Sequence, residues 1–232
     1  MKLVDICEAT DIQHIDIETI KSKILNDCQM YLKNCDDRFL YRGLNDESSF
    51  KPMSIIKHRK DRMPLNTTKL AHDLFDSYTL EKFGWKTRSD TLFVTGDYYR
   101  SMDYAYDQYN VYLVFPIGNF KFVYSELVDD FYAGVEDIPE VEETIKNHQT
   151  YIPTEEYRKD VYTFFDTLEY DNTQFESAIK SGNEIMLNCN NYYIIRVCDL
   201  YNSVHGHTIN VKRINTKVLK QLEKEFFEIL NK

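Results

Sequence analysis

Glycine and proline are scarce in this 232-residue chain, which contains only seven Gly and five Pro. Few turns are therefore signalled directly, and each of these residues tells more than usual about where an element ends. Long apolar stretches are also lacking, because no segment approaches the roughly 18 apolar residues needed to span a bilayer. We expect neither export nor membrane insertion, and a cytoplasmic location.

Acidic residues outnumber basic ones, and closely paired cysteines are lacking. The chain has 28 Lys and Arg against 38 Asp and Glu, a formal net charge of -10, which disfavours stable binding to DNA or RNA. One basic run, residues 57–62, is interpreted as a solvated loop, with a partner contact left open. The five cysteines contain no C-x-x-C pair, so we expect buried thiols in a reducing compartment and no zinc or redox site.

Apolar and aromatic side chains are plentiful. Hydrophobic residues make up 43% of the sequence and aromatic residues 14%, which is enough to fill a core. No repeat, low-complexity tract or Pro/Ser-rich linker interrupts the sequence. Together with the helices and strands expected below, these features predict one α+β domain over residues 1–232.

Apolar residues recur at helical spacing in several segments. The helix expected at residues 16–34 has Asp16 as its N-terminal cap, and the helix expected at residues 68–83 ends at Gly84 as a left-handed C-terminal cap. Helical patterns of the second half of the chain are expected to form a lateral layer over about 125–169 and a closing helix. Further predicted helices occupy residues 98–108, 125–132, 141–148, 154–168 and 216–230.

Strands are predicted between these helices. Residues 111–115 and 120–124 flank the sequence Pro-Ile-Gly-Asn, a spacing that favours an antiparallel hairpin. A second hairpin is predicted for residues 184–187 and 192–197, which flank an Asn-rich segment. Residues 54–66 show neither a helical nor a strand period, so they are expected to form a long basic loop.

Three short segments place a polar residue at the end of an expected strand. They are residues 40–43 (Leu-Tyr-Arg-Gly), 93–97 (Phe-Val-Thr-Gly-Asp) and 182–185 (Gly-Asn-Glu-Ile). Such strand ends often hold ligand-binding residues on an α+β scaffold. Each also has an ordinary interpretation, because an arginine or glutamate there is commonly a surface residue and threonine favours strands.

In their order along the chain, Arg42, Thr95 and Glu184 resemble the arginine, serine/threonine and glutamate triplet of the ADP-ribosyltransferase superfamily. The nearest resemblance is to the small transferase-like proteins of tailed bacteriophages. It extends through residues 59–64, the helix end Phe83-Gly84, Arg88, residues 92–105 and residues 115–122. It implies small antiparallel sheets that form a cleft for NAD, with helices packed on the outside.

The resemblance also implies a role for each residue. Arg42 would contact the NAD phosphates through its planar guanidinium, and Gly43 would let the backbone approach the ligand closely. Thr95 would orient the catalytic glutamate. That residue, Glu184, would bind a ribose hydroxyl and stabilise the positive charge that develops as the nicotinamide–ribose bond breaks.

Tyrosines would complete the NAD site, whereas the acceptor of ADP-ribose stays open. Tyr98 or Tyr99 would stack on the nicotinamide, and Tyr41 would lie beside the cofactor.

Arginine-modifying members carry Glu or Gln two residues before the catalytic glutamate, where this sequence has Gly182. Protein arginine is therefore not the expected acceptor, which leaves another amino acid, a nucleic-acid group, a small molecule or water. The expected partner is a host protein.

Two other functional classes stay open. One keeps the transferase-like fold without catalysis, as an acidic module that binds and inhibits a host defence protein. The other is a structural or virion-associated protein with no small-molecule site. A metal site is not expected, because His205 and His207 have no neighbouring Cys or carboxylate. A hydrolase triad is not expected either, since His58 and His72 have no Ser or Cys at catalytic spacing.

Overall fold

The computed structural model describes residues 16–45, 53–63, 67–135 and 154–232, and shows a mixed α+β protein. Its helices are α1 (Ile17–Asp27), α2 (Gln29–Asn34), α3 (Lys69–Phe83), α4 (Tyr98–Met102), α5 (Phe131–Val135), α7 (Glu155–Thr167), α8 (Phe175–Ser181), α9 (Val197–His205) and α10 (Thr216–Leu230), with short 3-10 turns η2 (Gln108–Asn110) and η3 (Val211–Arg213). Its strands are β1 (Tyr41–Gly43), β2 (Met53–Lys57), β3 (Leu92–Val94), β4 (Val111–Tyr124) and β5 (Ile185–Arg196).

The described strands form one antiparallel sheet, where the sequence had predicted separate small sheets. The order is β1-β4-β5-β2, and β3 pairs with the opposite end of β5 from β2. A further pair of backbone hydrogen bonds joins Tyr41 of β1 to Thr95, the residue after β3, with N···O distances of 2.7 and 3.0 Å. The first and third strands are thus linked directly, although neither is the other's neighbour along the main sheet.

Both predicted hairpins are wrong, because each is a single long strand. β4 and β5 pair with each other along their length. Between Ile117 and Phe120 β4 advances three residues while β5 advances two, from Asn191 to Cys189, so β4 contains a bulge. Gly118 lies in this bulge with φ 70°, a conformation that glycine adopts at little cost. The turn-forming residues therefore bend a continuous strand and do not reverse the chain.

Two other segments differ from prediction near the start of the chain. The expected loop 54–66 begins with strand β2, because its backbone groups pair with β5. The expected helix 16–34 divides at Cys28, whose φ of -113° and ψ of 29° are not helical. Asp16 caps the first half as predicted, since its carboxylate accepts a 2.8 Å hydrogen bond from Thr19 N.

Two predicted helices in the middle of the chain differ in the structure, and a third lies outside the described residues. The helix expected at 98–108 ends at Met102, and Asp107 then caps a separate turn, η2. The helix expected at 125–132 is replaced by α5, because the carbonyls of residues 125 and 126 accept hydrogen bonds from the side chain of Asn183 and are not available to a helix. Residues 141–148 lie outside the described part of the chain.

The remaining predicted helices are confirmed, and the structure shows the residues that cap their starts. Thr68 accepts a hydrogen bond from Ala71 N at the start of α3, and Gly84 ends that helix with φ 76°. α7 and α10 occupy the predicted segments, capped by Thr154 and Asn215. α8 and α9 were not predicted.

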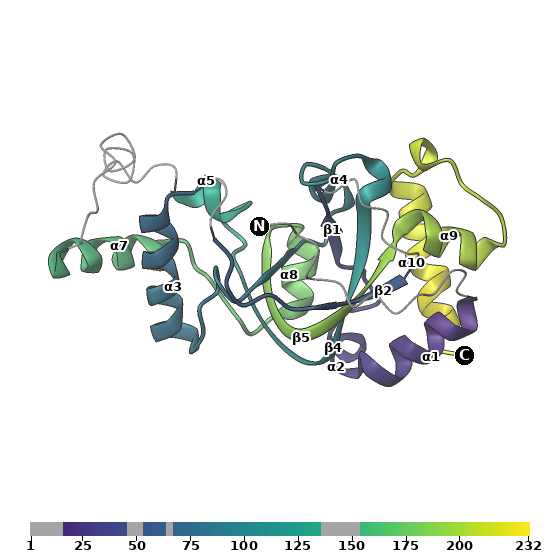
Figure 1. Cartoon of the computed structure of the whole chain (residues 1–232), viewed down its shortest axis with the longest axis horizontal. Coiled ribbons are helices and arrows are strands. Elements are labelled where there is room, and N and C mark those ends of the chain that lie inside the picture. The colour runs from purple at the N-terminus through teal and green to yellow at the C-terminus, as the bar shows by residue number, and fades with distance from the viewer. Residues whose placement is uncertain (1–15, 46–52, 64–66, 136–153) are drawn as a thin grey trace.

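Alternate residues of the strands face two hydrophobic cores. Leu92 and Val94 of β3 belong to the larger core, to which α1, α2, α8, α9 and α10 contribute. Phe93, between them, packs against a smaller core that contains residues of α3, α5 and α7, together with Val123 and Met186 of β4 and β5. In Figure 1 α3 and α7 lie at one end of the molecule and α9, α10 and α1 at the other. β3 therefore lies where the two cores meet.

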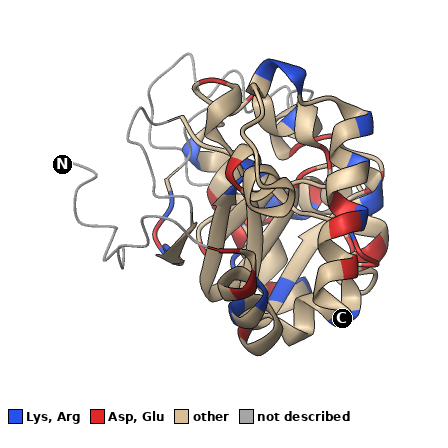
Figure 2. Cartoon of the chain, turned by 90° about the vertical axis from the view of Figure 1, so that its right-hand side faces the viewer, with Lys and Arg blue, Asp and Glu red and all other residues tan. Residues whose placement is uncertain are grey.

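Charged side chains lie on the surface, and the described cysteines are buried thiols. Acidic and basic side chains are mixed over the end of the molecule formed by α1, α9 and α10 (Figure 2). The four cysteines in the described part of the chain, Cys28, Cys35, Cys189 and Cys198, are buried free thiols, as predicted. No helix within the described ranges is long and apolar enough to cross a membrane.

Candidate functional site

The three segments selected from the sequence meet around β3. Tyr41, beside Arg42, shares two backbone hydrogen bonds with Thr95. Val94 pairs with Ile185, the residue after Glu184. The hydroxyl of Thr95 donates a 2.5 Å hydrogen bond to the carbonyl of Gly182, two residues before Glu184. Residues separated by up to 142 positions are therefore held together by adjacent backbone contacts.

Glu184 is a mostly buried carboxylate at the start of β5. Its backbone N donates to Asp129 O at 2.8 Å. Its Oε1 accepts hydrogen bonds from Arg88 Nη1 at 3.2 Å and from the backbone N of Phe131 at 3.3 Å. Burial raises the pKa of Glu184, and the Arg88 guanidinium opposes that rise. The carboxylate is thus held between a cation that favours its charge and an apolar setting that does not.

Three guanidiniums gather around Phe93 of β3; we call Arg42, Arg62 and Arg88 the arginine cluster. Arg42 Nη1 donates a 3.3 Å hydrogen bond to the carbonyl of Phe93. Arg62 Cζ lies 4.6 Å from the centre of the Phe93 ring and Arg88 Cζ lies 4.5 Å from it. Such contacts favour a cation over an aromatic face.

Among the described residues, the ion pair recorded for the arginine cluster is that of Arg88 with Glu184. Burial and the charges of Arg42 and Arg88 lower the pKa of Arg62 to about 9, so Arg62 stays protonated at neutral pH while its charge is destabilised. The Nε atoms of Arg42 and Arg88 are buried, and they have no hydrogen-bond partner within the described residues. Guanidiniums in this state are suited to bind an anion, because it would relieve their repulsion and accept their unused N–H groups.

A buried polar network in α3 fixes the turn that carries Arg88. Asp76 Oδ1 accepts hydrogen bonds from the backbone N of Arg88 at 2.7 Å and of Ser89 at 3.2 Å. The Ser89 hydroxyl donates to Asp76 Oδ2 and lies 3.1 Å from His72 Nε2. Because the serine proton goes to the aspartate, His72 is the donor to Ser89, the reverse of its role in a hydrolase triad. This network therefore positions Arg88.

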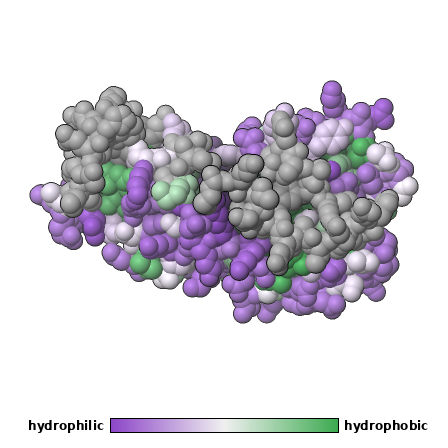
Figure 3. All heavy atoms as spheres, in the orientation of Figure 1, coloured by the Kyte–Doolittle hydropathy of each residue, from purple (hydrophilic) through white to green (hydrophobic). Residues whose placement is uncertain are grey.

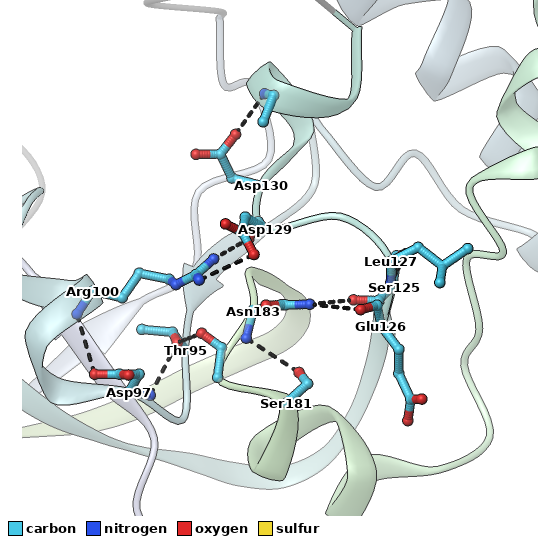
Figure 4. A network of polar contacts seen from close by, with 12 residues as sticks. Thr95, Asp97, Arg100, Ser125, Glu126, Leu127, Asp129, Asp130, Ser181 and Asn183 are labelled. Carbon is cyan, nitrogen blue, oxygen red and sulfur yellow. Dashed lines mark hydrogen bonds and ion pairs between the residues drawn. The ribbon is translucent and has the colours of Figure 1, made fainter.

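A second network joins the loop that precedes α5 to Asn183, the residue before Glu184 (Figure 4). The side chain of Asn183 donates to Ser125 O at 3.0 Å and to Glu126 O at 3.2 Å. Arg100 donates to the carbonyl of Asp129 at 2.8 Å and pairs with its carboxylate at 3.1 Å. Asn183 thus acts as an anchor for the loop.

The predicted aromatic residues are divided between core and surface. Tyr41 and Tyr98 lie in the larger core, with ring centroids 5.8 Å apart. Burial raises the pKa of Tyr98 to about 12. Tyr99 is 47% exposed. Of the two tyrosines predicted to stack on nicotinamide, only Tyr99 presents a free ring, since Tyr98 is packed inside.

Gly43 has a packing role that the sequence did not reveal. A Cβ at this position would lie 2.0 Å from Ser101 O and 2.7 Å from Ala105 N, both backbone atoms. The missing side chain thus allows β1 to contact the end of α4. Close approach of backbone to backbone explains this glycine without a ligand.

Replacement of Gly43 by Ala should lower the free energy of unfolding by about 3 kcal/mol, the upper part of the range for overpacking a site that cannot relax. Gly118→Ala is the matched control, because its Cβ would meet nothing within 4 Å and only its φ of +70° is unfavourable. That control should lose about 1 kcal/mol. Urea denaturation of both variants measures the difference, and equal losses would contradict the packing explanation.

The presence of glycine at position 182, where the arginine-modifying pattern has Glu or Gln, is also explained by the local structure. Gly182 ends α8 in the left-handed conformation, with φ 72°, and its Cβ would lie 3.3 Å from Asp97 Cβ. A glutamate or glutamine here would be strained. The fold therefore gives this position to a helix cap, not to an acceptor-binding side chain.

The sequence pointed to Arg42, Thr95 and Glu184 but assigned no role to Arg62 or Arg88. Arg62 belongs to a basic run that was interpreted as solvated, and its exposed neighbour Arg59 fits that interpretation, with an ion pair to Asp61. Arg62 differs because it stacks on Phe93. No group of His, Cys, Asp and Glu in the described part of the chain is arranged to hold a metal ion.

Comparison with known proteins adds no assignment: no protein-family model, no curated protein and no solved structure matches this chain.

Proposed function

We propose that this chain is an NAD-dependent ADP-ribosyltransferase of bacteriophage origin, which cleaves the nicotinamide–ribose bond and transfers ADP-ribose to a host macromolecule in the cytoplasm. The observation that carries the proposal is the arrangement around β3. The arginine cluster surrounds Phe93, and Arg88 of that cluster holds the carboxylate of Glu184 at 3.2 Å. A dianionic diphosphate next to a ribose is the kind of ligand that such a pairing of charges suits.

In the proposed reaction Arg42 and Arg62 bind the diphosphate of NAD, and the phosphate charges offset the repulsion within the arginine cluster. Among the described residues, both hydrogen bonds accepted by the Glu184 side chain are on Oε1. The charge of Arg88 favours the ionised form of this carboxylate. As the C–N bond breaks, nicotinamide leaves with the bonding electron pair and the ribose becomes positive, a charge that Glu184 stabilises. The acceptor then adds to the ribose carbon and releases its proton.

Thr95 acts in this scheme through the backbone. Its hydroxyl donates to Gly182 O and accepts from Asp97 N at 3.0 Å, so it ties the turn before Glu184 to the turn after β3. Thr95 is therefore a positioning residue, not one that touches the sugar. Because Gly182 offers no side chain to an acceptor, we favour an acceptor other than protein arginine.

A second candidate is a binding module of the same fold without catalysis. One observation favours it: the Arg88–Glu184 ion pair is already formed, and burial raises the pKa of the carboxylate. The site could then bind an anionic ligand, or serve only to join β5 to the turn after α3. This module would bind and inhibit a host protein through its surface.

Nicotinamide release from NAD by the purified protein distinguishes the two candidates. We expect release with NAD alone or on addition of bacterial lysate, and mass spectrometry with labelled NAD should then find ADP-ribose on a lysate component. Binding of NAD by calorimetry without release in either condition supports the binding module. Absence of NAD binding at millimolar concentration would reject the proposal.

A further inference from the structure

Exposed aromatic side chains concentrate in two segments near the candidate site. Eight large hydrophobic residues are exposed in the described part of the chain, and six of them lie between residues 99 and 132. We call these six the tyrosine surface: Tyr99, Tyr104, Tyr106, Tyr109, Leu127 and Tyr132. Their exposed fractions run from 47% to 63%. Tyrosine is enriched among the residues that dominate binding energy in protein interfaces.

The tyrosine surface has two segments, residues 97–110 and 126–132, which are fixed to each other by side-chain contacts. Arg100 binds both the carbonyl and the carboxylate of Asp129 (Figure 4). The hydroxyl of Tyr104 donates to Asp130 at 2.9 Å. Within the first segment Asp97 and Asp107 accept hydrogen bonds from the backbone at the starts of α4 and η2. The aromatic rings are therefore mounted on a pre-organised backbone, which reduces the entropy lost on binding.

The charge around these rings is acidic. Exposed carboxylates in the two segments are Asp97, Asp103, Asp107, Glu126 and Asp129. The only cation of residues 97–110, Arg100, is already paired with Asp129. A second copy of this chain and a nucleic acid would both be repelled by this surface. Lysine and arginine side chains, in contrast, would pair with the carboxylates and contact the faces of the tyrosine rings.

On the face drawn in Figure 3, hydrophobic residues form small separate patches among hydrophilic ones. The tyrosine surface combines aromatic rings with charge, and rings with one polar end suit an interface that is exposed to water before it binds.

We propose that the tyrosine surface docks a Lys/Arg-rich segment of a partner protein. The surface adjoins the candidate site through the backbone, since α4 begins three residues after Thr95 and Asp129 accepts a hydrogen bond from Glu184 N. Docking itself does not require NAD cleavage. Only the further step, that the docked protein carries the acceptor of ADP-ribose, rests on the proposed function.

Selection from a displayed library of random 12-residue peptides tests the docking. We expect peptides selected by the full chain to be enriched in Lys and Arg relative to the library, and their binding to weaken as salt rises. The double variant Tyr106→Ala, Tyr109→Ala should bind a selected peptide at least about tenfold more weakly. Asp103→Asn should weaken it by a smaller factor.

Leu80→Ala is the matched control, because Leu80 is equally exposed, at 47%, but lies on α3. It should bind the selected peptides as the wild type does. Selection of peptides without basic enrichment, or equal binding by the tyrosine double variant, overturns the proposal. Glu184→Gln should keep the peptide affinity while losing NAD cleavage, so failure of the docking and failure of the proposed function are separate outcomes.

Discussion

Glu184→Gln should reduce nicotinamide release by about 10²- to 10³-fold, the range seen when one pre-organised electrostatic group is removed from an active site. The amide keeps the size of the side chain and can still accept the hydrogen bonds from Arg88 and Phe131 N. It carries no charge, so it cannot offset the positive ribose. The variant should therefore retain the fold and the affinity for NAD while it loses the rate.

Glu223→Gln is the control for this variant. Glu223 of α10 is a second partly buried carboxylate whose pKa burial raises, and its Oε1 accepts a 2.9 Å hydrogen bond from Phe39 N. Its replacement should leave the rate unchanged. An equal rate for wild type and Glu184→Gln would remove Glu184 from the proposed mechanism, and an equal loss in both variants would trace the effect to the fold.

The pH dependence of nicotinamide release by the wild type is a second test of the role of Glu184. The proposed mechanism needs the ionised carboxylate, and burial raises the pKa of Glu184 above its ordinary value. Release should therefore fall as the pH is lowered through this raised pKa, at a higher pH than for an exposed glutamate. The residual activity of Glu184→Gln should not show this fall at low pH.

Arg42→Ala and Arg62→Ala should each weaken NAD binding by about 1 to 3 kcal/mol, the scale of a charge-assisted hydrogen bond. That range corresponds to roughly 5- to 150-fold in Kd. The physical reason is that both guanidiniums lie at Phe93, and neither has an ion pair with a carboxylate among the described residues. ADP-ribose should show the same losses, because it carries the same diphosphate.

Arg59→Ala separates a local effect from the basic run as a whole. Arg59 lies three residues before Arg62 but is exposed and paired with Asp61. Calorimetry should find its affinity for NAD close to that of the wild type. If Arg59→Ala and Arg62→Ala weaken binding equally, the effect comes from diffuse charge, and the assignment of Arg62 to the diphosphate is wrong.

Local signals were reliable where a single residue type decides the backbone. Asp16 caps its helix and Gly84 ends α3, as the sequence predicts, because capping depends on atoms within one turn. The same local signals failed at Gly118 and at the Asn-rich segment of β5. In both places β4 and β5 remain paired with each other, and β4 forms a bulge at Gly118. This pairing depends on residues that are far apart in the sequence.

The candidate site shows the same division. Arg42, Thr95 and Glu184 could be selected from the sequence because each follows or precedes a β-prone run. Arg62 and Arg88 could not be given a role, since an exposed arginine and one stacked on Phe93 have the same sequence signature. Gly43 was expected to admit the ligand, and Gly182 was noted as a departure from the arginine-modifying pattern. The structure gives Gly43 a packing role against α4 and Gly182 a role as helix cap.

By itself the sequence determined the acidic charge, the mixed α+β class, the helix caps at Asp16 and Gly84 and the three polar strand ends. Composition and local hydrogen bonding fix these features within a few residues of chain. Only the tertiary structure decided that one sheet joins the strand ends, that three guanidiniums surround Phe93, and that Arg88 holds Glu184. These contacts depend on which strands pair and in what register, and long-range pairing is set by the packing of the whole chain.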